Sequence, residues 1–371
     1  MQHRVSDLFH LQMGKTPSRN QSEYWESGSN KWVSISDLSN CSMYTAETKE
    51  AITDCAVRET NIRLVPKNTV IMSFKLSIGK TAITSEPVYT NEAIMAFINK
   101  DEELVLPEFL YYQLLSKDWG SAGNRAVMGT TLNKASLSQM KIYVPSLQKQ
   151  QDIVQILSHI DSQLKKTNES VNNLNDLVKS RFVEMFGALE PSVSISDACI
   201  EFIDGDWIES KDQSESGIRL IQTGNIGNGD FRDKRNRARY ISEQTFEQLK
   251  CHEVYANDVL ISRLPDPVGR ACIVPSDAGR SITAVDCSIV RLKKEWEPSF
   301  FVSYTMTKQY EHQIQSYLTG TTRKRISRSN LGKTKIPAAS FVLQQEFATF
   351  VAQVDKLRFE LARQCTSCVQ L

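Results

Sequence analysis

An internal repeat is the feature that most restricts how this 371-residue chain can fold. The stretch GTTLNKASLSQMKIYVPSLQKQQDI, which begins at Gly129, aligns with GTTRKRISRSNLGKTKIPAASFVLQQEF, which begins at Gly320, at an offset of about 191 residues. In both stretches a Gly-Thr-Thr loop leads through an extended segment ending in proline to a glutamine-rich helix start. This period is longer than the units of about 20 to 50 residues that build solenoids. The sequence therefore predicts a duplicated domain.

The repeat extends upstream into segments with the pattern of β-strands. The stretch LVPKNTVIMSFKLSIGKTAIT from Leu64 resembles VYANDVLISRLPDPVGRACIV from Val254, and Gly79 and Gly269 fall at matching places. In these stretches the side-chain pattern alternates with a period of two residues, which predicts β-strands. The glycines predict the turns that join the strands. The alternating residues are Val70, Met72, Phe74, Val259, Ile261 and Arg263.

Two segments have the apolar spacing of coiled-coil helices. In 148–186 and again from Gln344 onward, apolar residues recur at spacings of four and three. At about 1.5 Å per residue the first helix would be roughly 58 Å long. Each seam must be buried, so we expect the two helices to pair in antiparallel fashion and give the molecule pseudo-two-fold symmetry. The seam residues are Ile153, Leu157, Ile160, Leu164, Val171, Leu174, Val178, Phe350, Val354, Leu357 and Leu361.

The longer helix would extend past its partner toward its end. Lys179, Phe182, Met185 and Phe186 lie in that part of the sequence. We expect this stretch to expose apolar surface suited to a partner protein. Helices of this kind can also serve as spacers or as contacts between subunits.

Composition and charge exclude several classes of protein. The chain is 40% hydrophobic with a net charge of +1, so a surface for a polyanion must be local. It has no apolar run long enough for a signal peptide or a membrane span, which predicts a cytoplasmic protein without a membrane partner. Its eight cysteines follow neither a disulfide nor a zinc pattern, so we expect reduced, mostly buried thiols.

Catalytic motifs are not recognisable in the sequence. The GKT tripeptides at Gly14, Gly79 and Gly332 lack the earlier glycine that a phosphate-binding loop requires. The five histidines stand singly, without metal-ligand spacing. Cys365 and Cys368 form one CxxC, which fits helix packing better than a redox site. We expect no catalytic residue, no metal and no cofactor on this chain.

Local clusters of positive charge are the candidate contacts to DNA. The stretch DFRDKRNRARY from Asp230 carries five cations opposed by two aspartates, and on alternate positions of a strand they would face phosphates or guanine. A solvated charged surface is the alternative. The loop GTTRKRISRSN from Gly320 mixes cations with hydroxyls, as phosphate-binding loops do. The matching loop from Gly129 is less basic.

Polar residues that follow two matching strands form the second kind of candidate. WVSISDLSN from Trp32 corresponds to IRLIQTGNIGN from Ile218, and such amides and hydroxyls either read base edges or serve as ordinary turn residues. The complete set of candidate DNA-binding residues is Lys15, Ser34, Ser36, Lys75, Lys80, Arg125, Thr130, Thr131, Asn133, Lys134, Gln222, Thr223, Asn225, Arg232, Arg235, Arg237, Arg239, Arg263, Arg270, Thr321, Thr322, Arg323, Lys324, Arg325 and Arg328.

Taken in order, these motifs resemble the specificity subunits of Type I restriction-modification systems, the HsdS family. The carriers are GKTPSR at Gly14, EYW at Glu23, WVSISDL at Trp32, the two GTT loops, and the helix starts QKQQDIVQILSHIDSQL and LQQEFATFVAQVDKL. Each motif is weak alone, but their order, much of it repeated, is specific. The resemblance spans nearly the whole chain.

The resemblance implies an α+β fold with two tandem α/β target-recognition domains separated by long helices. We place the first domain at 1–147, the central helix at 148–186, the second domain at 187–342 and a shorter C-terminal helix at 343–371. Family members commonly continue farther than this last helix does, which puts full assembly of a restriction complex in question.

The implied function is non-catalytic recognition of a bipartite, asymmetric site on double-stranded DNA. Two modification subunits carrying S-adenosylmethionine would dock on the helices, and ATP-dependent restriction subunits would complete the complex. Two other functions are open from the residues alone: a coiled-coil scaffold or adaptor without DNA affinity, and a self-contained DNA-modifying enzyme.

Overall fold

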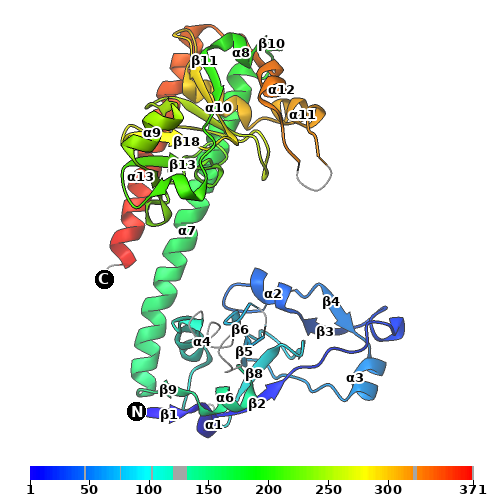
Figure 1. The fold of residues 1–371 in the computed structure, drawn as a ribbon. Coiled ribbons are helices and arrows are strands. Elements are labelled where there is room, and N and C mark those ends of the chain that lie inside the picture. Colours follow the sequence, from blue (N-terminus) through cyan, green and yellow to red (C-terminus); the bar gives the residue numbers. More distant parts are fainter. Residues whose placement is uncertain (46, 76, 102, 120–131, 321–323, 370–371) are drawn as a thin grey trace. The chain divides into compact units, whose positions relative to one another are not determined.

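The chain folds into two compact units, Met1–Gln163 and Leu164–Leu371. This computed structural model describes all residues except 46, 76, 102, 120–131, 321–323 and 370–371, and it describes side chains as far as residue 363. The long helix α7 (Leu147–Phe186) begins in the first unit and ends in the second (Figure 1). Each unit therefore combines a mixed α/β domain with part of this helix.

The first unit contains three sheets, with strand orders β1-β9, β2-β8-β5-β6 and β4-β3-β7. Before α7, its elements are β1 (Gln2–Arg4), α1 (Val5–Leu8), β2 (Phe9–Met13), η1 (Ser22–Tyr24), β3 (Asn30–Val33), α2 (Ile35–Asn40), β4 (Glu50–Ile52), α3 (Asp54–Thr60), β5 (Val70–Ser73), β6 (Thr81–Ile83), β7 (Tyr89–Thr90), β8 (Ile94–Asn99), α4 (Pro107–Leu115), α6 (Lys134–Gln139) and β9 (Lys141–Tyr143).

The second unit has sheets of order β10-β20, β11-β19-β16-β17 and β12-β14-β13-β18-β15. After α7, its elements are β10 (Pro191–Ser194), α8 (Ile195–Ala198), β11 (Cys199–Asp204), η2 (Ser210–Asp212), β12 (Gln213–Ser214), β13 (Ile218–Ile221), η3 (Thr223–Asn225), η4 (Arg235–Arg237), β14 (Arg239–Ile241), α9 (Glu243–Leu249), β15 (Glu253–Val254), β16 (Val259–Ser262), β17 (Ala271–Ile273), β18 (Ser281–Thr283), β19 (Cys287–Leu292), α10 (Pro298–Thr305), α11 (Lys308–Ser316), α12 (Arg328–Lys333), β20 (Lys335–Pro337) and α13 (Phe341–Val369).

The two units share the order of their four-stranded sheets and the register of matching strand pairs, although the third sheet has three strands in the first unit and five in the second. The four-stranded sheets have the same order, and Val70 pairs with Ile83 as Val259 pairs with Ile273. In each unit one parallel pair joins two strands far apart in the sequence, β3 with β7 and β13 with β18. The duplication predicted from the sequence is therefore confirmed at the level of the fold.

The central strands of the repeat are buried on both faces, which the sequence pattern alone did not predict. Val259 and Ile261 of β16 belong to one apolar cluster and Leu260 to another. Strand β5 divides its residues in the same way, with Val70 in one cluster and Ile71 in another. Successive side chains on a strand point to opposite faces, so these strands lie between two cores.

The turns after these strands use glycine at matching positions. Gly79 has a φ of 91° and Gly269 a φ of 87°, a region that other residues rarely adopt. A Cβ on Gly79 would lie 2.4 Å from a ring atom of Trp119. Both the conformation and the close contact require glycine here.

The second part of α7 pairs with α13 in antiparallel fashion inside the second unit (Figure 1). Arg181 Nη2 lies 3.1 Å from Glu346 Oε1, while Arg358 donates to the carbonyl of Leu174 farther back along α7. Contacts that run in opposite order along two helices establish the antiparallel pairing. The prediction of two paired helices is confirmed for this part of the chain.

The predicted seam residues are buried to different degrees. Val178 and Val354 are buried, and Leu174 and Phe350 pack against the same core. Leu357 is 50% exposed, because here the two helices line an open groove instead of a closed seam. The remaining residues, Leu157, Ile160, Leu164, Val171 and Leu361, are half-buried, and Ile153 packs on the core of the first unit.

The end of α7 is part of a domain core and not the exposed apolar surface expected from the sequence. Phe182 and Phe186 are 3% and 2% exposed. Their rings lie 5.5 and 4.8 Å from that of Phe300 on α10, and both contact Phe347 on α13. That expectation was wrong because α10 and α13 fold over this stretch.

Two further expectations can be compared with the described residues. Within that part of the chain, no helix is both long and apolar enough to cross a bilayer. Six cysteines are unpaired thiols, of which Cys199, Cys251, Cys272 and Cys287 are buried. Burial raises the pKa of Cys272 to about 12, so this thiol stays protonated at neutral pH. The side chains of Cys365 and Cys368 lie outside the described residues.

Candidate nucleic-acid interface

A pocket of about 310 Å³ in the second unit collects several of the candidate DNA-binding residues. Two separate segments form it: the turn after β13, and the basic segment that leads into β14. None of the described side chains that line it is a carboxylate. The lining residues are Arg219, Leu220, Gln222, Thr223, Gly224, Asn225, Lys234, Arg237, Ala238 and Arg239.

The turn is shaped by the hydrogen bonds of the Asn225 side chain. The backbone N–H of Gln222 donates to Asn225 Oδ1 at 2.9 Å, and Asn225 Nδ2 donates to the carbonyl of Arg232 at 2.9 Å. Asn225 is 9% exposed, so its amide serves the turn. Gln222 and Thr223 are half-buried and line the pocket.

The basic segment is fixed to the sheet by an ion-pair network. Arg219, whose side chain is 7% exposed, lies 2.6 Å from Asp233 Oδ1, and Arg235 donates to the other oxygen at 2.6 Å. Burial raises the pKa of the Asp233 carboxyl, but hydrogen bonds from the two arginines outweigh it and leave the pKa below its ordinary value. Asp233 therefore compensates the charge of two of the local cations.

Three other cations at the pocket have no such partner. Lys234, Arg237 and Arg239 are exposed, and among the described residues none of them forms an ion pair. Lys234 Nζ lies beside the backbone of Gly224, where an added Cβ would be 3.5 Å away. The pocket thus presents uncompensated positive charge beside a hydroxyl and an amide. A phosphate oxygen or the acceptor edge of a base fits this chemistry.

The basic segment is not the ribbon that the sequence predicted. Residues 235–237 form the 3₁₀ helix η4, and only from Arg239 does the chain become the strand β14. Alternate residues therefore do not share one face. What gathers the cations is the fold of this segment against the turn after β13.

The same place in the first unit has a different charge. Strand β3 is also followed by a capped turn, in which Ser34 Oγ accepts from the N–H of Asp37 at 3.2 Å. On the neighbouring strand, Glu50 of β4 pairs with Trp32 of β3. At the matching position of the second unit, Arg239 of β14 pairs with Leu220 of β13. Glu50 forms an ion pair with Arg19 at 2.5 Å. The two units thus share a frame but not the charge presented on it.

Comparison with known proteins matches both halves of the chain to one family. Residues 1–175 and 193–368 each match the family described as the Type I restriction modification DNA specificity domain. The chain belongs to this family.

Two relatives carry the same description in their names. The chain is 31% identical over 189 residues to the specificity subunit of the Type I restriction enzyme MjaIX of Methanocaldococcus jannaschii, covering 49% of this chain and 43% of that protein. It is 29% identical over 169 residues to the EcoR124I/EcoR124II specificity subunit of Escherichia coli, covering 43% and 40%. The matched stretches span less than half of either relative.

A solved structure has the same fold across the whole chain. It is the crystal structure of a Type I restriction-modification S subunit from M. genitalium, with a TM-score of 0.54 and 14% identity, covering 100% of this chain and 92% of that one. At this identity the similarity concerns the fold.

Two candidate residues in the second specificity domain are buried, which corrects the expectation that they contact DNA. Arg263 follows β16 directly, two residues after Ile261, and is 5% exposed. Its guanidinium lies 3.2 Å from Asp204. Arg270 is 8% exposed and donates to the carbonyls of Thr223 and Ile226 at 2.8 and 2.7 Å. Arg270 therefore holds the pocket turn in place instead of contacting a ligand.

The remaining candidate cations of the second specificity domain do not line the pocket. Arg232 is paired with Asp230 at 3.3 Å and Arg235 with Asp233. Lys324, Arg325 and Arg328 are exposed around the second GTT loop. Thr321, Thr322 and Arg323 lie outside the described residues.

In the first specificity domain the candidates are spread over several surfaces. Ser34 caps α2 and Ser36 accepts from Lys49, while Asn133 caps α6, whose first residue is Lys134. The basic candidates Lys15, Lys75, Lys80 and Lys134 are exposed, and Lys15 donates to the carbonyl of Thr60. Arg125, Thr130 and Thr131 lie outside the described residues.

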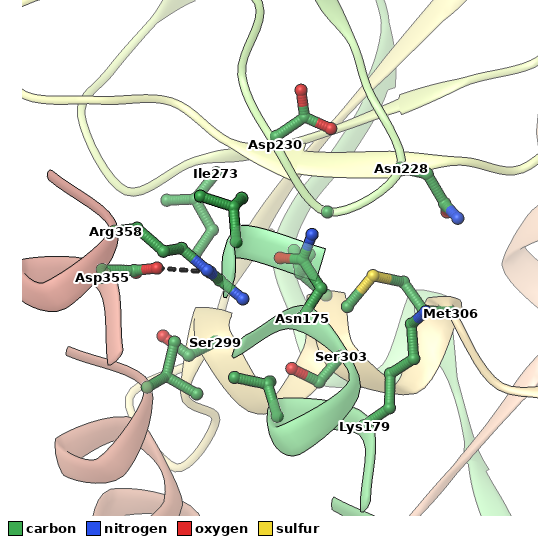
Figure 2. A pocket seen from close by; sticks show the side chains of 15 residues that line it. Asn175, Lys179, Asn228, Asp230, Ile273, Ser299, Ser303, Met306, Asp355 and Arg358 are labelled. Carbon is green, nitrogen blue, oxygen red and sulfur yellow. Dashed lines mark hydrogen bonds and ion pairs between the residues drawn. The ribbon is translucent and has the colours of Figure 1, made fainter. Parts of the chain in front are cut away.

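A second cavity of about 490 Å³ lies between α7, α10 and α13 of the second specificity domain (Figure 2). Its charges are balanced: Arg358 donates to Asp355 at 2.5 Å, and Lys179 lies 3.1 Å from Asp176. Asp230 at its rim pairs with Arg232. Among the described residues, no group of three or more His, Cys, Asp or Glu side chains is placed to hold a metal.

One residue of the pocket was missed by the sequence analysis. Arg219 stands inside the apolar strand Ile218–Ile221, and its guanidinium lies 5.5 Å from the ring of Phe231. A charged residue within a buried strand requires a partner, and this was the signal available in the sequence.

Proposed function

We propose that this chain is the DNA sequence-recognition subunit of a Type I restriction-modification complex. The observation that carries the proposal is the repeat of one specificity domain, in which the same capped turn presents different side chains. Two specificity domains that differ in this way favour a bipartite, asymmetric DNA site. The names of the matched relatives, which are specificity subunits, agree with this role.

We assign no catalytic step to this chain. The modification subunits would supply S-adenosylmethionine and methylate adenine, and restriction subunits would supply ATP-dependent cleavage. Two modification subunits would dock on the helices α7 and α13, and the complex would work in the cytoplasm on double-stranded DNA. We retain the predicted division into domains at 1–147 and 187–342, with helices at 148–186 and 343–371, as part of this proposal.

The DNA-facing residues of the proposal are the described candidates that are exposed or half-buried in each domain. In the first domain these are Lys15, Ser34, Ser36, Lys75, Lys80, Asn133 and Lys134; in the second they are Gln222, Thr223, Arg232, Arg235, Arg237, Arg239, Lys324, Arg325 and Arg328. Arg263 and Arg270 are excluded because they are buried, and Asn225 because its amide is used within the turn.

Selection from randomised duplexes tests the proposal. The full chain, together with its modification subunits, is expected to enrich two short motifs separated by a fixed gap. One contiguous motif, or no enrichment, would contradict it. A scaffold without DNA affinity would enrich nothing, whereas a self-contained enzyme would transfer a labelled methyl group to DNA without other subunits.

A further inference from the structure

We infer that the pocket formed by Gln222, Thr223, Lys234, Arg237 and Arg239 binds the phosphodiester backbone of DNA, and that the first specificity domain has no such anchor at the matching place. The inference rests on the proposed function and adds that, at this place, the second domain makes charged contacts to the DNA backbone that the first domain does not make. The second half-site would then be held by salt-sensitive contacts to the backbone.

The two matching segments differ in charge. Between the capped turn and the strand that follows, residues 41–50 contain one lysine and two glutamates, whereas residues 226–239 contain five cations and two aspartates. The formal net charge is therefore −1 in the first domain and +3 in the second. The strand register places Glu50 where the second domain has Arg239.

The two domains also differ in how their charged side chains are paired. In the first domain Lys31 is paired with Glu86 at 2.6 Å and with Glu47 at 3.2 Å. In the second, Asp233 compensates Arg219 and Arg235 and leaves three pocket cations uncompensated. Charges without a partner are the ones that can exchange counterions for phosphates.

The number of uncompensated cations in the pocket favours a phosphate over a base. One arginine or lysine suffices for the acceptor edge of a guanine, and a neutral base would leave the other cations of the pocket uncompensated. Phosphodiester groups carry the missing negative charge, and the hydroxyl of Thr223 can donate to their oxygens. The pocket therefore suits the backbone better than it suits a base edge.

Salt titration of DNA binding tests the inference on the full chain with its modification subunits. The variants are Lys234→Gln, Arg237→Gln and Arg239→Gln; all three side chains are exposed, so the fold should be kept. Each is expected to flatten the slope of log affinity against log salt concentration by about 1 per lost phosphate contact. Affinity should fall by a similar factor for specific and unrelated duplexes.

Two control variants remove the same charge elsewhere. Lys294→Gln alters an exposed lysine away from the pocket, and Lys49→Gln alters the exposed lysine of the matching segment in the first domain. Neither is expected to change the salt slope. If Lys49→Gln flattened the salt slope as much as the pocket variants do, the proposed difference between the two domains would be overturned.

The outcomes separate this inference from the proposed function. If the pocket variants keep the slope but change which bases are preferred at the second half-site, the pocket reads bases and the inference is overturned while the function stands. If the unaltered chain in its complex binds no duplex selectively, the proposed function fails and the inference fails with it.

Discussion

Gln150 and Gln344 occupy matching positions near the starts of α7 and α13, and each makes the same three hydrogen bonds in its own unit. Gln150 accepts from the N–H of Leu106 at 2.9 Å and donates to the carbonyls of Leu104 and Pro145 at 2.9 and 3.0 Å. The corresponding partners of Gln344 are Glu297, Glu295 and Ala339. Both glutamines are at most 1% exposed, so each joins a long helix to its domain through buried polar contacts.

Replacing either glutamine should destabilise the unit that contains it. Gln150→Ala and Gln344→Ala each remove three hydrogen bonds of a buried side chain and leave one N–H and two carbonyls without that partner, which costs roughly 1–3 kcal/mol. Calorimetry should show the transition of one unit shifted to lower temperature. The matched controls Gln151→Ala and Gln345→Ala alter exposed neighbours and should leave both transitions in place.

Removing the ring of Phe182 should strongly destabilise the second unit. This side chain is 3% exposed and contacts the rings of Phe300 and Phe347, so Phe182→Ala leaves a cavity and costs about 3–5 kcal/mol. Denaturant unfolding measures the change. Val183 is the next residue on the helix and is 60% exposed; Val183→Ala should stay within about 0.5 kcal/mol, and an equal loss there would show that this end of α7 is not core.

Arg270 should act on stability and not on DNA charge contacts. It donates hydrogen bonds to four backbone carbonyls, and burial lowers its pKa. Arg270→Gln should therefore cost roughly 1.5–3 kcal/mol of unfolding free energy. Lys80 follows the matching glycine and is exposed, so Lys80→Gln should leave stability unchanged. An unaltered unfolding midpoint for Arg270→Gln would contradict the assignment.

The ion pairs of Asp233 should weaken in acid. The pKa of Asp233 in the folded chain lies below the ordinary value of 3.8, so its contribution is fully present above that pH and is lost as the pH falls through the folded pKa. Asp233→Asn should therefore be less stable than the unaltered chain at neutral pH. Unfolding measured across the acid range should show the difference disappearing at low pH, and a constant difference would exclude this linkage.

The sequence predicted the elements that the repeat makes visible. The two GTT stretches, the glycines at 79 and 269, and the apolar spacing of 148–186 indicated duplicated domains, turns and a long helix. Each of these signals is local or periodic, so it can be found without knowing which residues meet. The helix observed at Leu147–Phe186 follows from such a signal.

The candidate site was predicted less well, because charge in a sequence does not reveal its partners. Arg263 and Arg270 were predicted to contact DNA, but both side chains are buried inside the domain. Arg263 directly follows strand β16, and Arg270 directly follows the turn at Gly269. Arg219 was missed although it holds Asp233 and lines the pocket. Which charges are compensated depends on contacts between distant segments.

The sequence by itself determined that this chain contains two copies of one domain joined through a long helix, because repeats and periodicity can be recognised from the order of residues alone. Only the tertiary structure decided which cations remain uncompensated, and that Glu50 and Arg239 stand at the same place in the two domains. The physical reason is that strand register and ion pairing bring together residues far apart along the chain. The sequence showed that the two copies differ in charge, but only the fold showed which of these charges occupy the same place and which are paired.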